Sequence, residues 1–283
     1  MEKQLQKGQV LLIVVLVMVV ALTVGLSVAS RSITNLRITT DDENSQRAFS
    51  AAEAGIERAV KGNCTDTTNG CIISKDFSEG FSENKTTFET KVTPILGAEF
   101  LVKGGVQVKQ DEGSDVWLSQ YSTDPSELYT HQWNGDLTVY WGDTSADCSN
   151  LSTVAALQVM VLAGDRAALQ NATLTQYAFD PCASSRGNNF SPPTTSSSVQ
   201  IDSQTFTYGA TISIANGLLM RVIPLYTNTT LGIKKASGTE IFPIQGQQII
   251  STGASGGTVR KVTFIQSYAS IPSEFFQYAL ISP

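Results

Sequence analysis

KGQVLLIVVLVMVVALTVGLSVAS, residues 7–30, is the stretch that decides the fold of this 283-residue chain. From Val10 to Ala29 it carries no charged residue, and at about 1.5 Å per residue a helix of this length spans a hydrocarbon layer of roughly 30 Å. A cleaved secretory signal, with Ala29-Ser30 near its cleavage site, is the alternative, but its apolar region would be shorter. The sequence therefore predicts a retained membrane helix, with 10–30 as its membrane part.

The same helix is predicted to continue into water. Residues 31–61 contain no proline, and their only glycine is Gly55, so no strong helix breaker coincides with the end of the apolar stretch. Glycine and asparagine at 62–63 then supply a C-terminal stop. We therefore expect one helix over 9–61, about 80 Å long at the standard rise.

Beyond the membrane, the helix shows one apolar face that is suited to packing on a domain. At about 100° per residue, Phe49, Ile56 and Val60 fall on a narrow stripe. Ala52 and Gly55 lie beside this stripe and are small enough to let a sheet approach closely. We expect these residues to form the packing face of the helix.

The composition is that of an exported surface protein. Charged residues make up 16% of the chain, below the roughly 25% that is usual in proteins. The formal net charge is −6, and the sequence contains no basic cluster beyond Lys234-Lys235. A nucleic-acid binder needs a basic stripe that displaces phosphate counterions, so nucleic acid is excluded as a predicted partner.

The four cysteines are suited to two disulfides formed outside the cytoplasm, because their number is even and the N-terminus is of an export type. We expect Cys64 to pair with Cys71, closing a short polar loop, and Cys148 to pair with Cys182. Four buried free thiols are the alternative. The cysteines form no C-x-x-C motif and the chain has a single histidine, so we expect neither a metal site nor a cofactor.

Residues 84–283 change from helical to strand-like periodicity, because short runs rich in β-branched and aromatic residues alternate with turn residues. We expect an α+β fold in which a mainly antiparallel β-sandwich follows the helix, with 62–83 as a disulfide-closed loop and connection. The Ser/Pro-rich stretch 183–198 predicts a loop that forms a long surface connection, and two subdomains divided there are the alternative. Glycines within 253–258 predict a hairpin turn. The runs that predict strands are 88–95, 98–110, 115–121, 137–141, 154–164, 173–180, 204–209, 210–215, 218–226 and 259–271.

Two motifs of the helix resemble the type IV pilin superfamily, and within it minor pilins and pseudopilins of the PilX type. These motifs are Lys7-Gly8 before the apolar stretch and AFSAAEAGIERA at 48–59. The resemblance implies a leader over 1–8, which a prepilin peptidase removes between Gly8 and Gln9, and methylation of Gln9. It also implies that the helix joins other pilin subunits in a filament.

The chain departs from major pilins at two positions. Most pilins carry a glutamate at the fifth mature position, where this chain has Ile13. In the family, that carboxylate pairs with the N-terminal amine of a neighbouring subunit inside the membrane, where an uncompensated charge is costly. A subunit without it resembles those that lead assembly at a filament tip, although Ile13 also suits a permanent lipid-facing anchor. The first mature residue is often phenylalanine, and here it is Gln9.

The resemblance implies membrane lipid, a prepilin peptidase and other pilin subunits as partners. It places the protein in the inner or cytoplasmic membrane as a single-pass protein before assembly, and in an extracellular filament or at the cell surface afterwards. The predicted function is that of a structural minor pilin that displays a β domain for adhesion, priming or uptake. A bitopic surface protein that never assembles and carries a carbohydrate- or partner-binding sandwich is the alternative.

Candidate catalytic residues are few, and we do not predict an enzyme. His131 is not accompanied by a G-x-S-x-G motif, so the hypothesis of an anchored hydrolase has little support. The acidic run 111–115 offers oxygen ligands for calcium but lacks the terminal glutamate of an EF-hand loop. Trp117, Trp133 and Trp141 suit a carbohydrate-binding platform or, as we expect, core packing.

Overall fold

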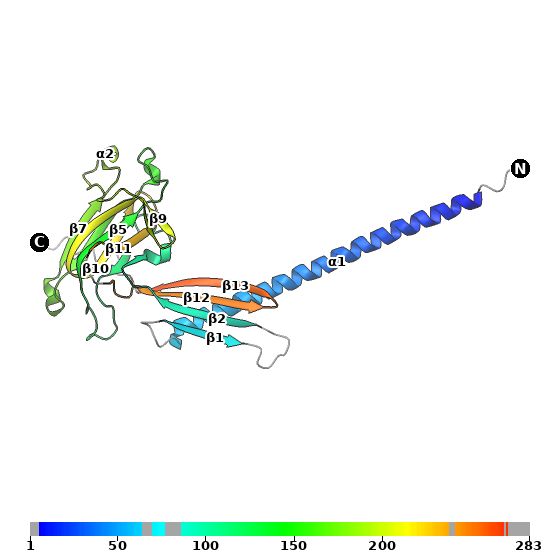
Figure 1. The fold of residues 1–283 in the computed structure, drawn as a ribbon, viewed down its shortest axis with the longest axis horizontal. Coiled ribbons are helices and arrows are strands. Elements are labelled where there is room, and N and C mark those ends of the chain that lie inside the picture. The colour runs from blue at the N-terminus through cyan, green and yellow to red at the C-terminus, as the bar shows by residue number, and fades with distance from the viewer. Residues whose placement is uncertain (1–5, 64–69, 77–85, 238–240, 269, 271–283) are drawn as a thin grey trace. The chain divides into compact units, whose positions relative to one another are not determined.

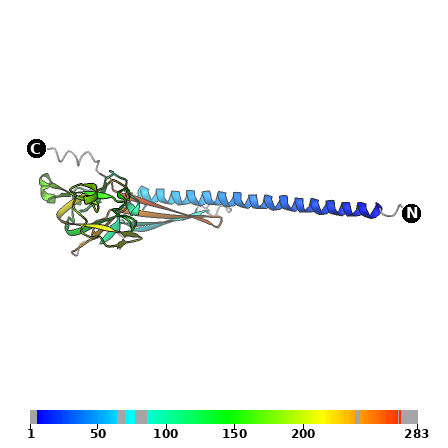
Figure 2. The ribbon, with the colours of Figure 1, turned by 90° about the horizontal axis from the view of Figure 1, so that it is seen from above.

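The computed structural model describes residues 6–63, 70–76, 86–237, 241–268 and 270. Its first element is α1, a 53-residue α-helix over Gln6–Arg58 that Figures 1 and 2 show without a break. A π-helical turn, η1 (Ala59–Asn63), closes it, and Gly62 there has a φ of 88°. The predicted long helix and its glycine stop are therefore confirmed, because only glycine adopts this left-handed backbone at no steric cost.

The N-terminal half of α1 is long and apolar enough to cross a membrane. Its large side chains from Leu11 to Val28 are all exposed, with Met18 at 71%. The Thr23 hydroxyl donates a hydrogen bond to the carbonyl of Val20 one turn back. This polar group is therefore satisfied inside the helix, as lipid requires.

Four strands form a sheet in the order β1-β2-β12-β13. Glycines at 256–257, both with positive φ, make the turn between β12 and β13, so the predicted hairpin is confirmed. β1 lies within 62–83, which was predicted to be a loop and connection, so that part of the prediction is wrong. The strands are β1 (Cys71–Asp76), β2 (Thr87–Pro94), β12 (Gly246–Ser255) and β13 (Thr258–Ser267).

Seven further strands form a second, antiparallel sheet in the order β3-β11-β5-β10-β6-β7, with β4 also paired to β10. A two-stranded β8–β9 hairpin accompanies it. The strands are β3 (Glu99–Leu101), β4 (Ser114–Trp117), β5 (Trp133–Trp141), β6 (Ala156–Ala163), β7 (Thr173–Phe179), β8 (Val199–Ile201), β9 (Gln204–Phe206), β10 (Tyr208–Leu225) and β11 (Leu231–Lys235). The short helices are η2 (Val102–Gly105), η3 (Leu151–Thr153), η4 (Arg166–Asn171) and α2 (Ala183–Arg186).

The 18-residue strand β10 joins the two parts of this sheet. Its first part, up to Gly217, pairs with β5, whereas Leu219–Val222 pairs with β4. The register shifts between Ile214 and Gly217, where Asn216 has a φ of 51°. Because a bulge bends its strand, β10 lets the sheet curve over a single core and gives it a sandwich-like character.

Two predicted segments differ from the structure for local reasons. The run 98–110 was predicted to be one strand, but β3 ends at Leu101. Lys103 and Gly104 follow in left-handed conformations, which end the extended backbone. The stretch 183–198 was predicted to be a loop and is largely irregular, although it begins with α2.

The main core covers one face of the seven-stranded sheet. Trp133 and Trp141 are almost completely buried there, and the indole of Trp133 stacks on Phe242 with ring centroids 4.3 Å apart. The other face carries a smaller cluster around Trp117 and Leu219. The prediction that the tryptophans pack in the core is confirmed.

The chain divides into two units rather than into a helix and one domain of 84–283. Unit 1 consists of Met1–Asn63, Ile72–Thr90 and Ile250–Val262, and unit 2 consists of Cys64–Cys71, Lys91–Ile249 and Thr263–Pro283. The boundary crosses β2, β12 and β13 and separates the first residue of β1 from the rest of that strand. Most of unit 2 is therefore an insertion between two adjacent strands of the four-stranded sheet, an arrangement that local periodicity does not reveal.

Candidate functional site

The contact between α1 and its sheet in unit 1 depends on two glycines. A Cβ atom added to Gly55 would overlap the hydroxyls of Thr90 and Ser251 and lie 2.9 Å from the Phe88 ring. A Cβ added to Gly253 would overlap the backbone of α1, lying 2.7 Å from the amide nitrogen of Ala52. Helix and strand therefore meet backbone to backbone, which larger residues at these positions would prevent.

The buried face of α1 is formed by small residues. Ala52 and Gly55 are buried and Ile56 is half-buried, as the predicted packing face requires. Phe49 and Val60 were also assigned to that face, but they are 46% and 43% exposed, so their assignment is wrong. The reason is geometric, because a sheet that approaches the helix backbone this closely has no room for large side chains. The other buried residues of this face are Ala48, Ala51 and Ala59.

Polar side chains on the sheet complete this contact. The hydroxyls of Thr90 and Ser251, both fully buried, hydrogen-bond to each other at 2.7 Å. The guanidinium of Arg260 on β13 donates two hydrogen bonds to the hydroxyl of Ser45 on α1. The Thr90–Ser251 bond satisfies buried hydroxyls that would otherwise be costly, whereas the Arg260 bonds link β13 to α1 in an exposed part of the contact.

Between the apolar half of α1 and its packed half lies a stalk, residues 30–43, whose side chains are all exposed or nearly so. Ile33, Leu36 and Ile38 are 54–66% exposed there. The Thr34 and Thr40 hydroxyls donate hydrogen bonds back to carbonyls of the same helix. Within the described residues, no element of unit 1 covers this apolar surface.

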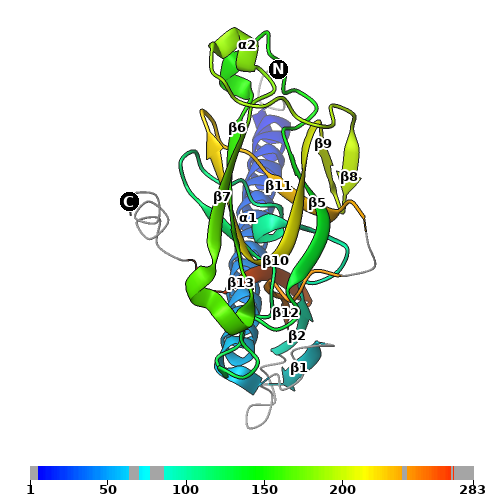
Figure 3. The same cartoon turned by 90° about the vertical axis from the view of Figure 1, so that its left-hand side faces the viewer.

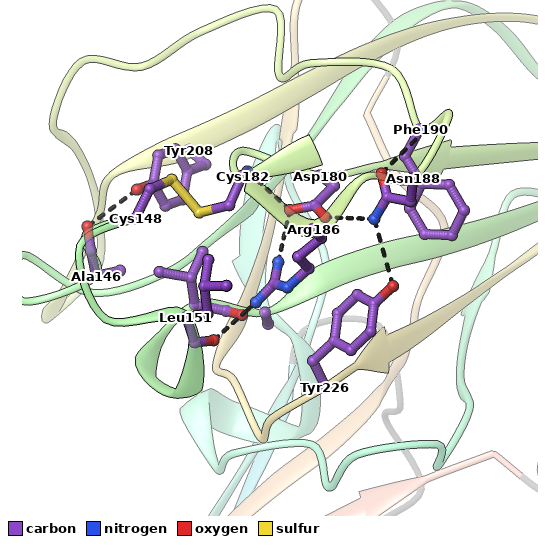
Figure 4. A network of polar contacts seen from close by, with 12 residues as sticks. Ala146, Cys148, Leu151, Asp180, Cys182, Arg186, Asn188, Phe190, Tyr208 and Tyr226 are labelled. Carbon is purple, nitrogen blue, oxygen red and sulfur yellow. Dashed lines mark hydrogen bonds and ion pairs between the residues drawn. A yellow bond between two sulfur atoms is a disulfide. The ribbon is translucent and has the colours of Figure 1, made fainter. Parts of the chain in front are cut away.

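A second candidate site lies in unit 2, where Cys148 and Cys182 are joined by a disulfide (Figure 4). The predicted Cys148–Cys182 pairing is thereby confirmed. Beside it, the fully buried carboxylate of Asp180 accepts hydrogen bonds from the Cys182 amide, the Arg186 guanidinium and the Asn188 amide. The disulfide and one carboxylate thus fix a long loop at the same place.

Arg186 extends this network to a second loop. Its guanidinium donates hydrogen bonds to the carbonyls of Leu151 and Val154, at 2.7 and 2.6 Å, and lies 4.2 Å from the centre of the Tyr226 ring. Figure 4 shows Arg186 between Asp180, Leu151 and Tyr226. The arrangement serves to hold the two loops together, because the buried guanidinium binds a carboxylate of one loop and backbone carbonyls of the other.

The sequence analysis missed this network. Arg186 lies in the Ser/Asn-rich stretch that was predicted to be a surface connection, and nothing local shows that its side chain turns inward. One available signal was Asp180 itself, two residues before Cys182, a spacing at which an aspartate commonly accepts a hydrogen bond from the following backbone.

The predicted processing residues Gly8 and Gln9 lie in the first turns of α1, and the structure describes their backbone as helical. Cys71 is disulfide-bonded, and its predicted partner Cys64 lies outside the described residues. Processing between Gly8 and Gln9 and the pairing of Cys64 with Cys71 therefore stay predictions.

The remaining candidates do not converge. His131 is exposed, with a left-handed φ of 51°. In the acidic run, Glu112 pairs with Lys103 at 3.0 Å and Asp115 is bound by Arg221 through two hydrogen bonds. Cations therefore hold two of the three carboxylates considered for calcium, and the described part of the chain contains no cluster of metal-ligating side chains.

No protein-family model, curated protein or solved structure matches this chain.

Proposed function

We propose that this protein is a structural subunit of a type IV pilus or a related filament, anchored and assembled through α1, and that unit 2 is the part that it displays. The observation that carries the proposal is the uncovered stalk of residues 30–43. An isolated helical segment of this length is marginally stable in water, and its exposed isoleucines and leucine add an unfavourable apolar surface. Packing against the helices of neighbouring subunits removes both costs.

The division into units supports the same function. Unit 1 combines a long helix with a sheet held against its C-terminal half, and this leaves the N-terminal half free for lipid and for other helices. Unit 2 is inserted into that sheet between β2 and β12, and its loops are fixed by a disulfide and a buried ion pair. Such rigid loops suit display outside the cell.

Ile13 favours a position at the start of a filament. It lies in the apolar half of α1 and is 56% exposed. A subunit that carried a glutamate there would need a neighbouring amine to neutralise it within the membrane. A leading subunit has no earlier neighbour, so an aliphatic residue removes the cost of an unpaired charge.

Processing is tested by the N-terminus of the protein recovered from sheared surface filaments. We expect a mature chain that begins at methylated Gln9. Gly8→Arg should leave the chain at full length in the membrane fraction, whereas the control Gln6→Ala should be processed normally. An intact N-terminus in the wild-type protein, together with its absence from filaments, would instead indicate a surface protein that does not assemble.

Assembly through the stalk is tested separately. Replacing Ile33 and Leu36 with asparagine should lower incorporation into filaments by at least about tenfold, without changing the amount in the membrane, because it removes the apolar contact that neighbours would cover. Thr39→Asn, also on the exposed stalk, is the control. Unchanged incorporation of the double variant would contradict the proposed role of the stalk.

A further inference from the structure

The edges of the two sheets differ in how they are protected against pairing with another chain. Proteins usually guard an edge strand with charged residues, with proline or by making it short. β13 carries Arg260 and Lys261 in its exposed half, β1 carries Lys75 and Asp76, and β3 has only three residues. β7, at the other end of the seven-stranded sheet, has none of these features.

β7 reads TLTQYAF and contains neither a charged residue nor a proline over its seven residues. Along one side it pairs with β6 from Thr173 to Phe179. On its other side, the segment at Ser191 reaches only the last residues, where the Ser191 amide donates to the carbonyl of Ala178. In the part of the chain that the structure describes, residues 173–177 therefore have no strand on their outer side, and Figure 3 shows β7 beside β6.

We propose that β7 pairs in antiparallel fashion with β7 of a second copy of this chain, with Thr175 opposite Thr175. Within the described chain, the five residues 173–177 have no strand on their outer side, and Thr175 is at their centre. A register centred on Thr175 therefore lets all five residues pair. It places Thr173 opposite Tyr177 of the other copy. Thr–Thr and aromatic–β-branched pairs are among the cross-strand pairs that stabilise a sheet.

The absence of charged residues on β7 favours a second copy of this chain over an unrelated partner. In a two-fold pairing centred on Thr175, a charge at that position would face its own copy, and like charges at 173 and 177 would face each other. β7 has none, and the exposed residues Thr173 and Thr175 are small enough to meet across the axis. The pairing joins two sheets into one and leaves α1 uninvolved, so it holds whether or not the chain enters a filament.

The register is tested by oxidation of variants of the full chain in membranes, each of which carries one added cysteine. Thr175→Cys should give a disulfide-linked dimer, since opposite residues in a sheet lie about 4.5–5.5 Å apart at Cα, within the range of a disulfide. Thr173→Cys alone should give none, because the two copies of that residue would be separated by about 14 Å. Thr263→Cys, on the charged edge strand β13, is the second control.

The affinity is tested on the detergent-solubilised full chain by analytical ultracentrifugation. Thr175→Lys places two like charges opposite each other and should weaken the dimer at least about fivefold, whereas Thr175→Ser should change it little. Thr175 is exposed, so both variants should retain the fold, which the intact Cys148–Cys182 disulfide can confirm. The proposal would be overturned if all three cysteine variants cross-linked equally or if Thr175→Cys gave no dimer. Cross-linking of Thr175→Cys to a different protein would also overturn it.

Discussion

In unit 1 the surfaces that meet carry mainly alanine, glycine, serine and threonine beside the ring of Phe88, whereas the core of unit 2 is filled by tryptophan, phenylalanine and branched aliphatic residues. Gly253 and Ala52 mark the first kind of contact, in which two backbones nearly touch. Trp133 and Phe242, stacked ring on ring, mark the second. One contact depends on the absence of side-chain atoms and the other on their presence.

This difference predicts opposite sensitivities. Adding a methyl group should damage the helix–sheet contact of unit 1, and removing side-chain atoms should damage the core of unit 2. Hydrogen exchange measured by mass spectrometry can follow each unit separately in the full chain. Four substitutions, taken from the largest expected effect to the smallest, test the comparison.

Trp141→Ala should have the largest effect, destabilising unit 2 by about 3–5 kcal/mol, the usual cost of a large cavity. The indole is fully buried and donates a hydrogen bond to the carbonyl of Ala155 at 2.9 Å, so that carbonyl also loses its partner. Faster exchange should be confined to unit 2. Phe49→Ala is the matched control, because that ring is 46% exposed and its removal should leave both units nearly unchanged.

Asp180→Ala should destabilise unit 2 by about 3 kcal/mol, because it leaves the Arg186 charge buried without its carboxylate. This loss of stability lies at the low end of the range for a broken buried ion pair, since Arg186 keeps its hydrogen bonds to backbone carbonyls. Asp165→Ala, which removes an exposed helix cap, is the control and should cost about 1 kcal/mol. Equal effects of the two variants on hydrogen exchange would show that the buried network is dispensable.

Gly55→Ala should destabilise unit 1 by up to about 2 kcal/mol. The added methyl group overlaps Thr90 and Ser251, at a cost of roughly 1–3 kcal/mol, and the better helix propensity of alanine offsets about 1 kcal/mol of it. Gly25→Ala is the control within the same helix, because nothing lies within 4 Å of the added atom. Stabilisation of unit 1 by Gly55→Ala would contradict the close approach of helix and sheet.

Lys234→Met should have the smallest effect, below about 1 kcal/mol, since the ion pair with Glu99 is about 40% exposed on both sides. The hydrogen bond that the Lys234 ammonium donates to the Glu99 carboxylate raises the pKa of Lys234. An interaction that raises the pKa of a lysine in the folded state stabilises the protein fully below the ordinary lysine pKa of about 10.4. That stabilisation is lost as the pH rises through the folded-state pKa. The difference in stability between wild type and variant should therefore disappear as the pH rises through the raised pKa of Lys234, and a difference that persisted at higher pH would exclude the ion pair as its cause.

The two candidate sites differ in how much the sequence revealed. The small residues of the helix motif at 48–59 were recognisable, but their apolar neighbours Phe49 and Val60 were assigned to the same face. Helical periodicity finds a face by its hydrophobicity, and it cannot tell which side a sheet will approach. The Asp180–Arg186 network was invisible because its members are polar residues of a loop, and only their burial gives them their role.

The sequence by itself determined the long helix, its glycine stop, most strands and the second disulfide pair, because these depend on local periodicity, turn residues and composition. The tertiary structure alone decided that unit 2 is inserted between β2 and β12, that β10 bends at Asn216, and that β7 ends a sheet without charged residues. These features arise from pairing between residues far apart in the chain. Backbone hydrogen bonds between strands form with almost any side chain, so the order of strands leaves little trace in the sequence.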